Sequence, residues 1–318
     1  MAAGYVIDMI DVGQGDAFVV ATWTKGGIKN CLIDAGRKSA GSTVVRHLQK
    51  HYDSKLTYAV LSHVDDDHIG GFRDVLAAGI RPETVFVNDP RDALERFVKK
   101  GAVLLSEQAV QINASITTSD DIIKEIDRLG IKRRTAFAGE SLTLSAALTI
   151  DFLSPDRDAF PELVSKFNKR NRQKLSERAP DARRACTAEN DASVVCAAIY
   201  DIEERYDRAL FTGDACLKTL ERVAKESFDY VKVPHHGSWH CCDDALVAAW
   251  IAGAQSVRGA FSFGENSHGH PDAEVVESFR SRAAKILCTH CHGTVQSRRV
   301  GATNIGTWGG KLDYCSCG

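Results

Sequence analysis

The sequence predicts an α/β protein in which two mixed sheets pack face to face between outer helices, as a four-layer α/β/β/α sandwich. Short apolar segments with the character of strands open the chain, and strands then alternate with helical segments. The second half of the chain repeats this order of elements. With 318 residues, 44% of them hydrophobic, the chain is long enough to bury the core that such a sandwich needs.

In the first half, apolar and often β-branched runs alternate with glycine turns and with segments of helical spacing. The predicted strands are Tyr5–Ile10, Ala17–Trp23, Cys31–Ile33, Tyr58–Leu61, Thr84–Val87, Ser141–Leu144 and Leu148–Leu153. The predicted helices are Thr43–Tyr52, Phe72–Ala78, Arg91–Lys99 and Ser119–Leu129. We expect Ser119 to cap the last helix, because Asp120 and Asp121 then lie in its first turn.

The second half shows the same alternation, with polar residues directly after several strands. The predicted strands are Ser193–Tyr200, Arg208–Thr212, Tyr230–Val233, Val257–Phe263, Ala284–Leu287 and Thr294–Gln296. The predicted helices are Cys216–Lys225, Asp243–Ile251 and Asp272–Arg282. A Lys- and Arg-rich stretch at about residues 155–190 is interpreted as an insertion into one domain, residues 1–300, and residues 301–318 form a cysteine-containing tail.

Composition limits the classes of function. The formal net charge of −2 argues against a uniformly basic nucleic-acid-binding surface, although a local basic patch remains compatible with it. The first residues do not have a basic segment followed by an apolar one, and no apolar run of about 18 residues occurs, so we expect neither a signal peptide nor a membrane span. We therefore expect a cytoplasmic protein whose ten cysteines are reduced or bind metal.

The segment after the predicted strand Tyr58–Leu61 is the most informative in the chain. It contains His63, Asp65, Asp67 and His68, an H-x-D-x-D-H pattern followed by a glycine pair. Imidazole nitrogens and carboxylate oxygens at this density suit one or two divalent transition-metal ions. The alternative is a solvated acidic turn. It is disfavoured because two histidines around three aspartates are costly directly after a buried strand unless a cation neutralises them.

Four further polar segments lie at predicted strand ends: Glu189–Ser193, Leu210–Ala215, Val231–Ser238 and Asn266–Pro271. Each is weak alone, because a Gly-Asp pair after a strand is usually a helix-entry turn and His-His-Gly is usually a polar turn. Their common position at strand ends, in this order after the H-x-D-x-D-H segment, is specific.

This order of motifs resembles the metallo-β-lactamase fold hydrolases over roughly residues 5–298. Within them the chain most resembles the nuclease-like domain of the DNA-uptake protein ComEC and its stand-alone relatives, without the membrane-channel segments of ComEC. The resemblance rests on the H-x-D-x-D-H segment together with Asp11–Ala17, Leu32–Gly36, Asn190–Val195, Phe211–Asp214, Val233–Ser238 and Gly269–Pro271.

The resemblance implies a centre of two divalent metal ions. The implied ligands are His63, Asp65, Asp67, His68, Asp214, His235 and His236, with Asp191 as a weaker candidate. The first His-Asp pair would face one metal and the second pair the other. Asp214 would bridge both metals, and one histidine of the adjacent pair, with His235 preferred, would complete the second.

The chain also departs from the commonest pattern of that superfamily. Asp65 stands where the pattern has a histidine, and no histidine occurs near residues 190–193, where Asn190 or Asp191 would be a weaker ligand. More oxygen and less nitrogen in the donor set shifts preference from Zn²⁺ towards Mn²⁺, and the choice between these ions stays open.

A binuclear centre suggests hydrolysis. Two ions about 3.5–4 Å apart would share a hydroxide and stabilise charge on an attacked phosphorus or carbonyl group. Asp67 would also orient the nucleophile, and His270 is a candidate general acid or phosphate contact, with a plain turn residue as the alternative. Ser238 and Lys232 are candidates for anion binding or for structural roles. Asp16 and Asp34, in glycine turns, are expected to be structural.

Three classes of function fit the motifs. The first is a phosphodiesterase, above all a nuclease on DNA or RNA, whose substrate backbone a basic run could contact. That run, which could equally be a solvated helix face, contains Lys166, Lys169, Arg170, Arg172, Lys174, Arg178, Arg183 and Arg184. The second is a hydrolase of a cyclic nucleotide, phosphocholine ester or lactone, and the third is a non-catalytic binding module. A regulatory protein partner is compatible with each class, and the oligomeric state stays open.

The cysteines near the end of the chain form a separate feature. Cys288, Cys291, Cys315 and Cys317 could together hold a structural zinc ion, although their spacing fits no standard zinc finger. Ordinary reduced thiols are the alternative.

Overall fold

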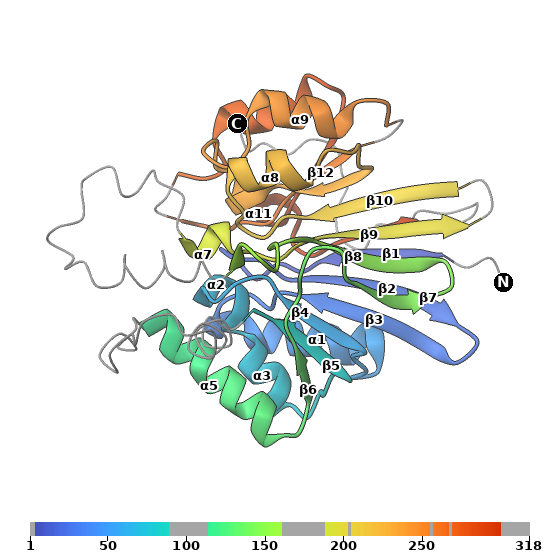
Figure 1. Cartoon of the computed structure of the whole chain (residues 1–318), viewed down its shortest axis with the longest axis vertical. Helices are drawn as coiled ribbons and strands as arrows, with labels where there is room; N and C mark the ends of the chain where they lie inside the picture. Colours follow the sequence, from blue (N-terminus) through green and yellow to red (C-terminus); the bar gives the residue numbers. More distant parts are fainter. Residues whose placement is uncertain are drawn as a thin grey trace, which may run out of the picture.

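The strands of this protein form two mixed sheets that lie between two layers of helices (Figure 1). The computed structural model describes residues 4–88, 114–160, 188–202, 205–254, 257–266 and 269–299. The strands are β1 (Tyr5–Met9), β2 (Phe18–Thr24), β3 (Gly27–Ile33), β4 (Tyr58–Leu61), β5 (Thr84–Val87), β6 (Lys132–Arg134), β7 (Ser141–Ser145), β8 (Leu148–Ser154), β9 (Val195–Ile202), β10 (Arg205–Phe211), β11 (Tyr230–Lys232), β12 (Arg258–Phe261), β13 (Lys285–Cys288) and β14 (Val295–Arg299).

The described helices include six that the sequence predicts and five short helices of three or four residues that it does not predict. They are η1 (Lys38–Ala40), α1 (Gly41–Tyr52), α2 (Asp66–Ile69), α3 (Phe72–Ala77), α5 (Ala114–Arg128), α7 (Ala188–Asp191), α8 (Leu217–Val223), η5 (Pro234–Gly237), α9 (Asp244–Ile251), α10 (Ala273–Arg280) and α11 (Thr289–His292). Among the described residues, no helix has both the length and the apolar character that crossing a membrane requires.

The two sheets have the same arrangement of seven strands. The first has the order β14-β1-β2-β3-β4-β5-β6 and the second β13-β12-β11-β10-β9-β8-β7. In each sheet a set of antiparallel neighbours is continued by parallel neighbours, β3 to β6 in the first and β10 to β13 in the second. Carboxyl ends of parallel strands meet at one edge, so the loops after β4, β10, β11 and β12 gather at one end of the sandwich.

Alternation of side chains along the strands creates three apolar layers. Between the sheets, Phe18 of β2 packs on Phe211 of β10, with ring centroids 5.5 Å apart. In the first sheet, the side chains on the other face pack against α1, α3 and α5. In the second sheet, the side chains on the other face pack against α8, α9 and α10, where Trp250 and Phe279 are fully buried. The predicted four-layer α/β/β/α sandwich is therefore confirmed.

Most predicted elements are present with shifted ends, one prediction was wrong, and one strand was missed. Helix α5 begins at Ala114, so Ser119 lies buried inside the helix and the prediction that it caps the helix was wrong. Strand β6 was not predicted, since its three residues, Lys132–Arg134, are all basic. Residues 91–99, 161–187 and 301–318, which include a predicted helix, the basic run and the tail, lie outside the described residues.

Replacing Phe211 with alanine tests the packing between the sheets. We expect the free energy of unfolding to fall by about 3–5 kcal/mol, because the ring fills the space against Phe18 and no neighbour can replace it. Urea unfolding followed by circular dichroism measures the change. The control is Trp23→Ala on the half-exposed Trp23, which should change stability by no more than about 0.5 kcal/mol. Equal effects of the two substitutions would contradict this account of the core.

Candidate metal centre

The predicted ligand residues come from loops that follow strands of both sheets. His63 follows β4, and α2 then carries Asp67 and His68. Asp214 follows β10, and η5 presents two adjacent histidines directly after β11. In Figure 1 this end of the sandwich lies at the left, beside α2 and α7, and the β2–β3 hairpin points away from it.

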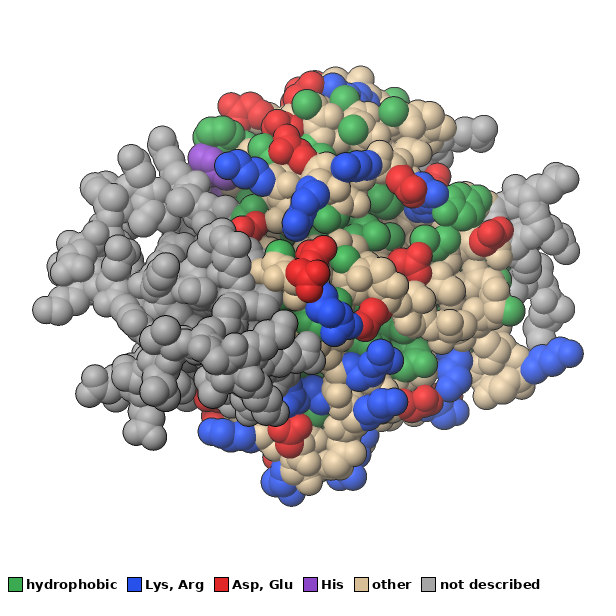
Figure 2. Space-filling model, viewed as in Figure 1, with side chains coloured by type: hydrophobic (Ala, Val, Ile, Leu, Met, Phe, Trp, Pro, Cys, Tyr) green, Lys and Arg blue, Asp and Glu red, His purple; other side chains and the backbone are tan. Residues whose placement is uncertain are grey.

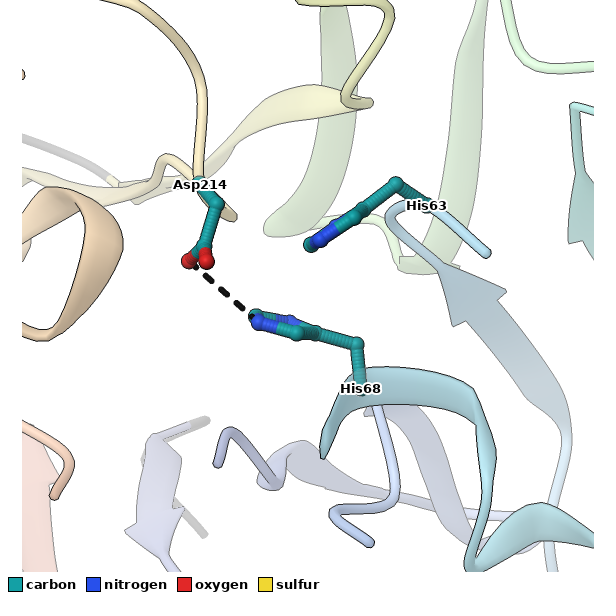
Figure 3. A group of neighbouring side chains, drawn as sticks. All are labelled: His63, His68 and Asp214. Atoms are coloured by element: carbon teal, nitrogen blue, oxygen red, sulfur yellow. Dashed lines mark ion pairs between the residues drawn. The ribbon is translucent and has the colours of Figure 1, made fainter. Parts of the chain in front are cut away.

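His63, His68 and Asp214 form the first group of candidate ligands. Both histidine rings come from the segment after β4 and point towards the carboxylate of Asp214, which follows β10 of the other sheet (Figure 3). The Nε2 atom of His68 lies 3.3 Å from Oδ1 of Asp214, and the two imidazole centroids are 4.1 Å apart. One potential ligand atom from each residue lies within 4.8 Å of the others, so a single ion can contact all three.

Asp67, His68 and His236 form a second group that shares His68 with the first. The Nε2 atom of His236 lies 3.4 Å from Oδ2 of Asp67 and 3.7 Å from Oδ2 of Asp214. His235 is also close, with Nε2 3.7 Å from the same oxygen of Asp214. Both histidines of the pair are therefore within reach of Asp214, but the described ligand groups include only His236.

Each buried histidine is held in place through its Nδ1 atom. Nδ1 of His68 lies 2.9 Å from Oδ2 of Asp34, Nδ1 of His63 lies 2.9 Å from Oγ of Ser62, and Nδ1 of His236 lies 2.7 Å from the carbonyl oxygen of Ser262. These contacts turn Nε2 towards the shared centre, as partners of metal-binding histidines do.

The Nε2 atoms of His63, His68 and His236 are buried and form no hydrogen bond of good geometry within the described part of the chain. Buried polar atoms are rarely left without a partner. Three such nitrogens beside two carboxylates are the donor set that a divalent transition-metal ion requires, so these residues fit a metal centre.

Three residues that we expected to be structural or anion-binding lie inside the centre. Asp16 forms a buried ion pair with Lys232. The Nζ atom of Lys232 also donates a hydrogen bond to the carbonyl oxygen of Gly213 at 2.6 Å and lies 3.4 Å from Oδ1 of Asp214. Asp34 accepts hydrogen bonds from the backbone and the hydroxyl of Ser62, both at 2.7 Å. The ammonium group of Lys232 therefore balances buried carboxylates and does not face an incoming anion.

Glycine at position 15 allows the β1–β2 loop to pack on the H-x-D-x-D-H segment. Gly15 has φ +143°, and a Cβ atom there would lie 2.4 Å from the carbonyl oxygen of Asp67. That same oxygen accepts a hydrogen bond from the backbone N–H of Asp16 at 3.0 Å. The close approach fixes the position of Asp67 from the neighbouring loop.

The remaining candidate residues lie around the buried groups. Asp65 is more exposed, with Oδ2 3.6 Å from Nε2 of His63. Nδ1 of His270 lies 3.5 Å from Oδ2 of Asp272, and its ring is 5.6 Å from that of His235. Asp191 accepts a hydrogen bond from the hydroxyl of Thr219 at 2.7 Å and belongs to none of the described ligand groups.

The structure describes two of the four cysteines of the predicted zinc site. Cys288 is buried, Cys291 is exposed, and Cys315 and Cys317 lie outside the described residues. No ligand group found in the described ranges contains a cysteine. Cys216 is disulfide-bonded, so the expectation of reduced thiols was wrong for this residue, whereas the described Cys31, Cys196, Cys241, Cys242, Cys288 and Cys291 are free.

Solved structures show which fold this arrangement belongs to. No family model and no curated protein sequence matches the chain. The crystal structure of Zn²⁺-bound PqqB from Methylobacterium extorquens superposes with a TM-score of 0.50 at 10% identity, over 92% of this chain and 99% of that one. The metallo-β-lactamase fold protein YhfI from Bacillus subtilis gives a TM-score of 0.47 at 10% identity, over 92% and 100%. This chain has the metallo-β-lactamase fold. The narrower likeness to ComEC stays a prediction.

Within this metallo-β-lactamase fold, the carboxylates that favour a bound cation also raise the pKa of two buried histidines. Burial alone lowers the pKa of His68, but Asp214 and neighbouring carboxylates raise it well above its ordinary value. The pKa of His236 is raised in the same way by Asp214 and Asp67 against the effect of burial. Burial lowers the pKa of His235 to about 4, because the nearby His236, His270 and Lys232 add to this effect and Asp214 opposes it only in part.

These pKa values predict that metal binding releases protons. Because the pKa values of His68 and His236 are raised, both imidazoles hold a proton more tightly in the metal-free protein than an ordinary histidine does, whereas the pKa of His235 is lowered to about 4. Binding a metal through the two raised groups displaces their protons, so the apparent affinity should fall as the pH is lowered. Calorimetric titration with Mn²⁺ or Zn²⁺ in two buffers of different ionisation enthalpy measures the release. Binding without proton release, and with no pH dependence between pH 6 and 8, would contradict this assignment.

Proposed function

We propose that this protein is a metal-dependent phosphodiesterase that cleaves DNA or RNA. The observation that carries the proposal is a set of three buried Nε2 atoms that form no hydrogen bond of good geometry with the described residues and that face two carboxylates at the junction of the sheets. His63 and Asp214 would hold one divalent ion, and Asp67, His68 and His236 would hold a second, because Nε2 is the one free ring nitrogen of His68 and can bind a single ion. A carboxylate oxygen of Asp214 also lies within reach of the second ion, and Mn²⁺ and Zn²⁺ are both compatible. Such ions act as Lewis acids and lower the pKa of water for attack on phosphorus.

The residues of the chain have distinct parts in this proposal. Asp34 and Ser62 keep the histidine rings oriented, and Lys232 offsets the charge of the buried carboxylates. Burial alone would raise the pKa of Asp67, but His236 and His68 lower it below its ordinary range, so its carboxylate is ionised and able to orient a nucleophile. His270 lies beyond His235 and is the candidate donor of a proton to the leaving oxygen.

Exposed cations beside the centre support a polyanionic substrate. Arg37 and Lys38 are exposed and directly follow Gly36, whose carbonyl oxygen accepts a hydrogen bond from Gly71 N–H at 2.8 Å. The loop that carries these cations therefore packs against the segment with α2. Elsewhere on the described face in Figure 2, acidic and basic side chains are interspersed, in keeping with the net charge near zero. A local pair of cations can contact a phosphate backbone without a basic overall charge.

Cleavage assays with refilled metal test the proposal directly. Metal-stripped protein supplied with Mn²⁺ or Zn²⁺ should cut labelled single- or double-stranded DNA or RNA. Asp214→Asn should lower the rate at least about 100-fold, because even changes to groups behind metal ligands cost 10- to 100-fold. The matched control is Asp53→Asn on an exposed left-handed residue, which should leave the rate unchanged.

Protein shown to hold metal that cuts none of these substrates would refute the nuclease proposal. Cyclic nucleotides, phosphocholine esters and lactones are then the substrates to test.

Salt dependence separates a nucleic-acid substrate from a small one. Replacing Arg37 and Lys38 by serine should weaken oligonucleotide binding at low salt and lower the slope of log affinity against log salt by about 1 per cation. The control is Lys25→Ser, on the hairpin that points away from the centre. An unchanged slope in the double variant would show that these cations do not contact the substrate.

A further inference from the structure

We propose that Trp239 is a binding platform for a nucleobase of single-stranded nucleic acid at the solvent-facing edge of the metal centre. The proposal deepens the proposed function and rests on it, since it names the part of the substrate that this residue recognises. Trp239 is half exposed and comes directly after the segment His235–Ser238 that completes the centre.

The exposed fractions of the ligand side chains locate the open edge. The side chains of His68, His236 and Asp214 are at most 5% exposed, so they form the buried floor. The side chains of Asp65 and His235 are 37% and 34% exposed. Substrate therefore approaches from the side of Asp65 and His235.

Trp239 is connected to this open edge by a short series of contacts. Its backbone N–H donates a hydrogen bond to Oδ2 of Asp272 at 2.8 Å. That oxygen lies 3.5 Å from Nδ1 of His270, whose ring centroid is 5.6 Å from the ring of His235. The backbone of Trp239 is thus tied, through Asp272, to the candidate proton donor His270 and to the loop in which His235 meets solvent.

The backbone around Trp239 is held in one conformation. Asp272 N–H donates to the carbonyl oxygen of Gly237 at 2.9 Å, and Cys241 N–H donates to that of Ser238 at 3.0 Å. Gly237, with φ +94°, packs so closely that an added Cβ would lie 2.6 Å from Cβ of Pro271. An aromatic side chain on a fixed turn loses little freedom when a base stacks on it.

The ring itself suits a flat aromatic ligand. Its centroid lies 3.9 Å from that of His240, so an imidazole supports the indole and extends the aromatic surface. The other exposed large aromatics among the described residues, Trp23 and Tyr206, lie on β2 and β10 near the hairpin ends remote from the centre. Stacking on an aromatic side chain binds any base, which fits a nuclease without sequence preference.

The test compares binding of two labelled hexamers with phosphorothioate backbones, which resist cleavage, to Mn²⁺-loaded protein. One hexamer carries thymine bases and the other is abasic, and fluorescence anisotropy gives both affinities. Trp239→Ala should weaken binding of the thymine hexamer by about 5- to 150-fold and leave the abasic hexamer unchanged. Trp239→Phe should retain most of the affinity, and the matched control Trp23→Ala should behave as wild type.

Three results of the binding test would overturn the platform: wild type binds both hexamers equally well, it binds neither hexamer, or Trp239→Ala changes both affinities by the same factor. The proposal of hydrolysis and the proposal of the platform can be refuted independently. Base-dependent binding through Trp239 by a protein that cuts no unmodified DNA or RNA would refute the hydrolysis and support the platform. Metal-dependent cutting that Trp239→Ala leaves unchanged on both thymine and abasic substrates would support the hydrolysis and refute the platform.

Discussion

The rest of the structure depends on how charge is neutralised at the junction of the two sheets. Asp16, Asp34 and Asp214 are almost completely buried there, and burying ionised carboxylates without compensation is costly. Lys232 supplies one fixed positive charge by its ion pair with Asp16. His68 supplies a second, because surrounding carboxylates raise its pKa well above the ordinary value despite burial. A bound divalent ion would supply the remaining positive charge and displace the histidine protons.

The sandwich produces this junction from its strand pattern. Parallel strands in both sheets end at the same end of the molecule, so loops far apart in the sequence meet there. Hydrogen bonds between loops of the two sheets hold these loops in place. One runs from Ser262 Oγ to the carbonyl oxygen of Gly15 at 2.7 Å. Another joins Val194 N–H to the carbonyl oxygen of Ser62 at 2.8 Å. The packing of the sheets and the geometry of the centre are therefore coupled.

Local patterns in the sequence were enough to predict the layers and the groups at the strand ends. Strand alternation is local, and the H-x-D-x-D-H segment carries its ligand types in adjacent residues. Contacts between distant segments were not predictable in this way. The position of Asp16 in the centre depends on Lys232 from the other sheet, and the backbone of Trp239 is held by a hydrogen bond to Asp272. The start of α5 was missed because the helix continues upstream through Ala114, which overrides the capping pattern at Ser119.

Anomalous diffraction from crystals of Mn²⁺-loaded protein tests the central claim most directly. The account predicts an anomalous peak in contact with Nε2 of His68 and a carboxylate oxygen of Asp214, because these buried groups share one centre in the described structure. Refined occupancy should fall when crystals are transferred to lower pH, as protons return to the histidines. A map without a peak at this position at saturating Mn²⁺ or Zn²⁺, with His68 still paired to Asp214, would contradict the metal centre.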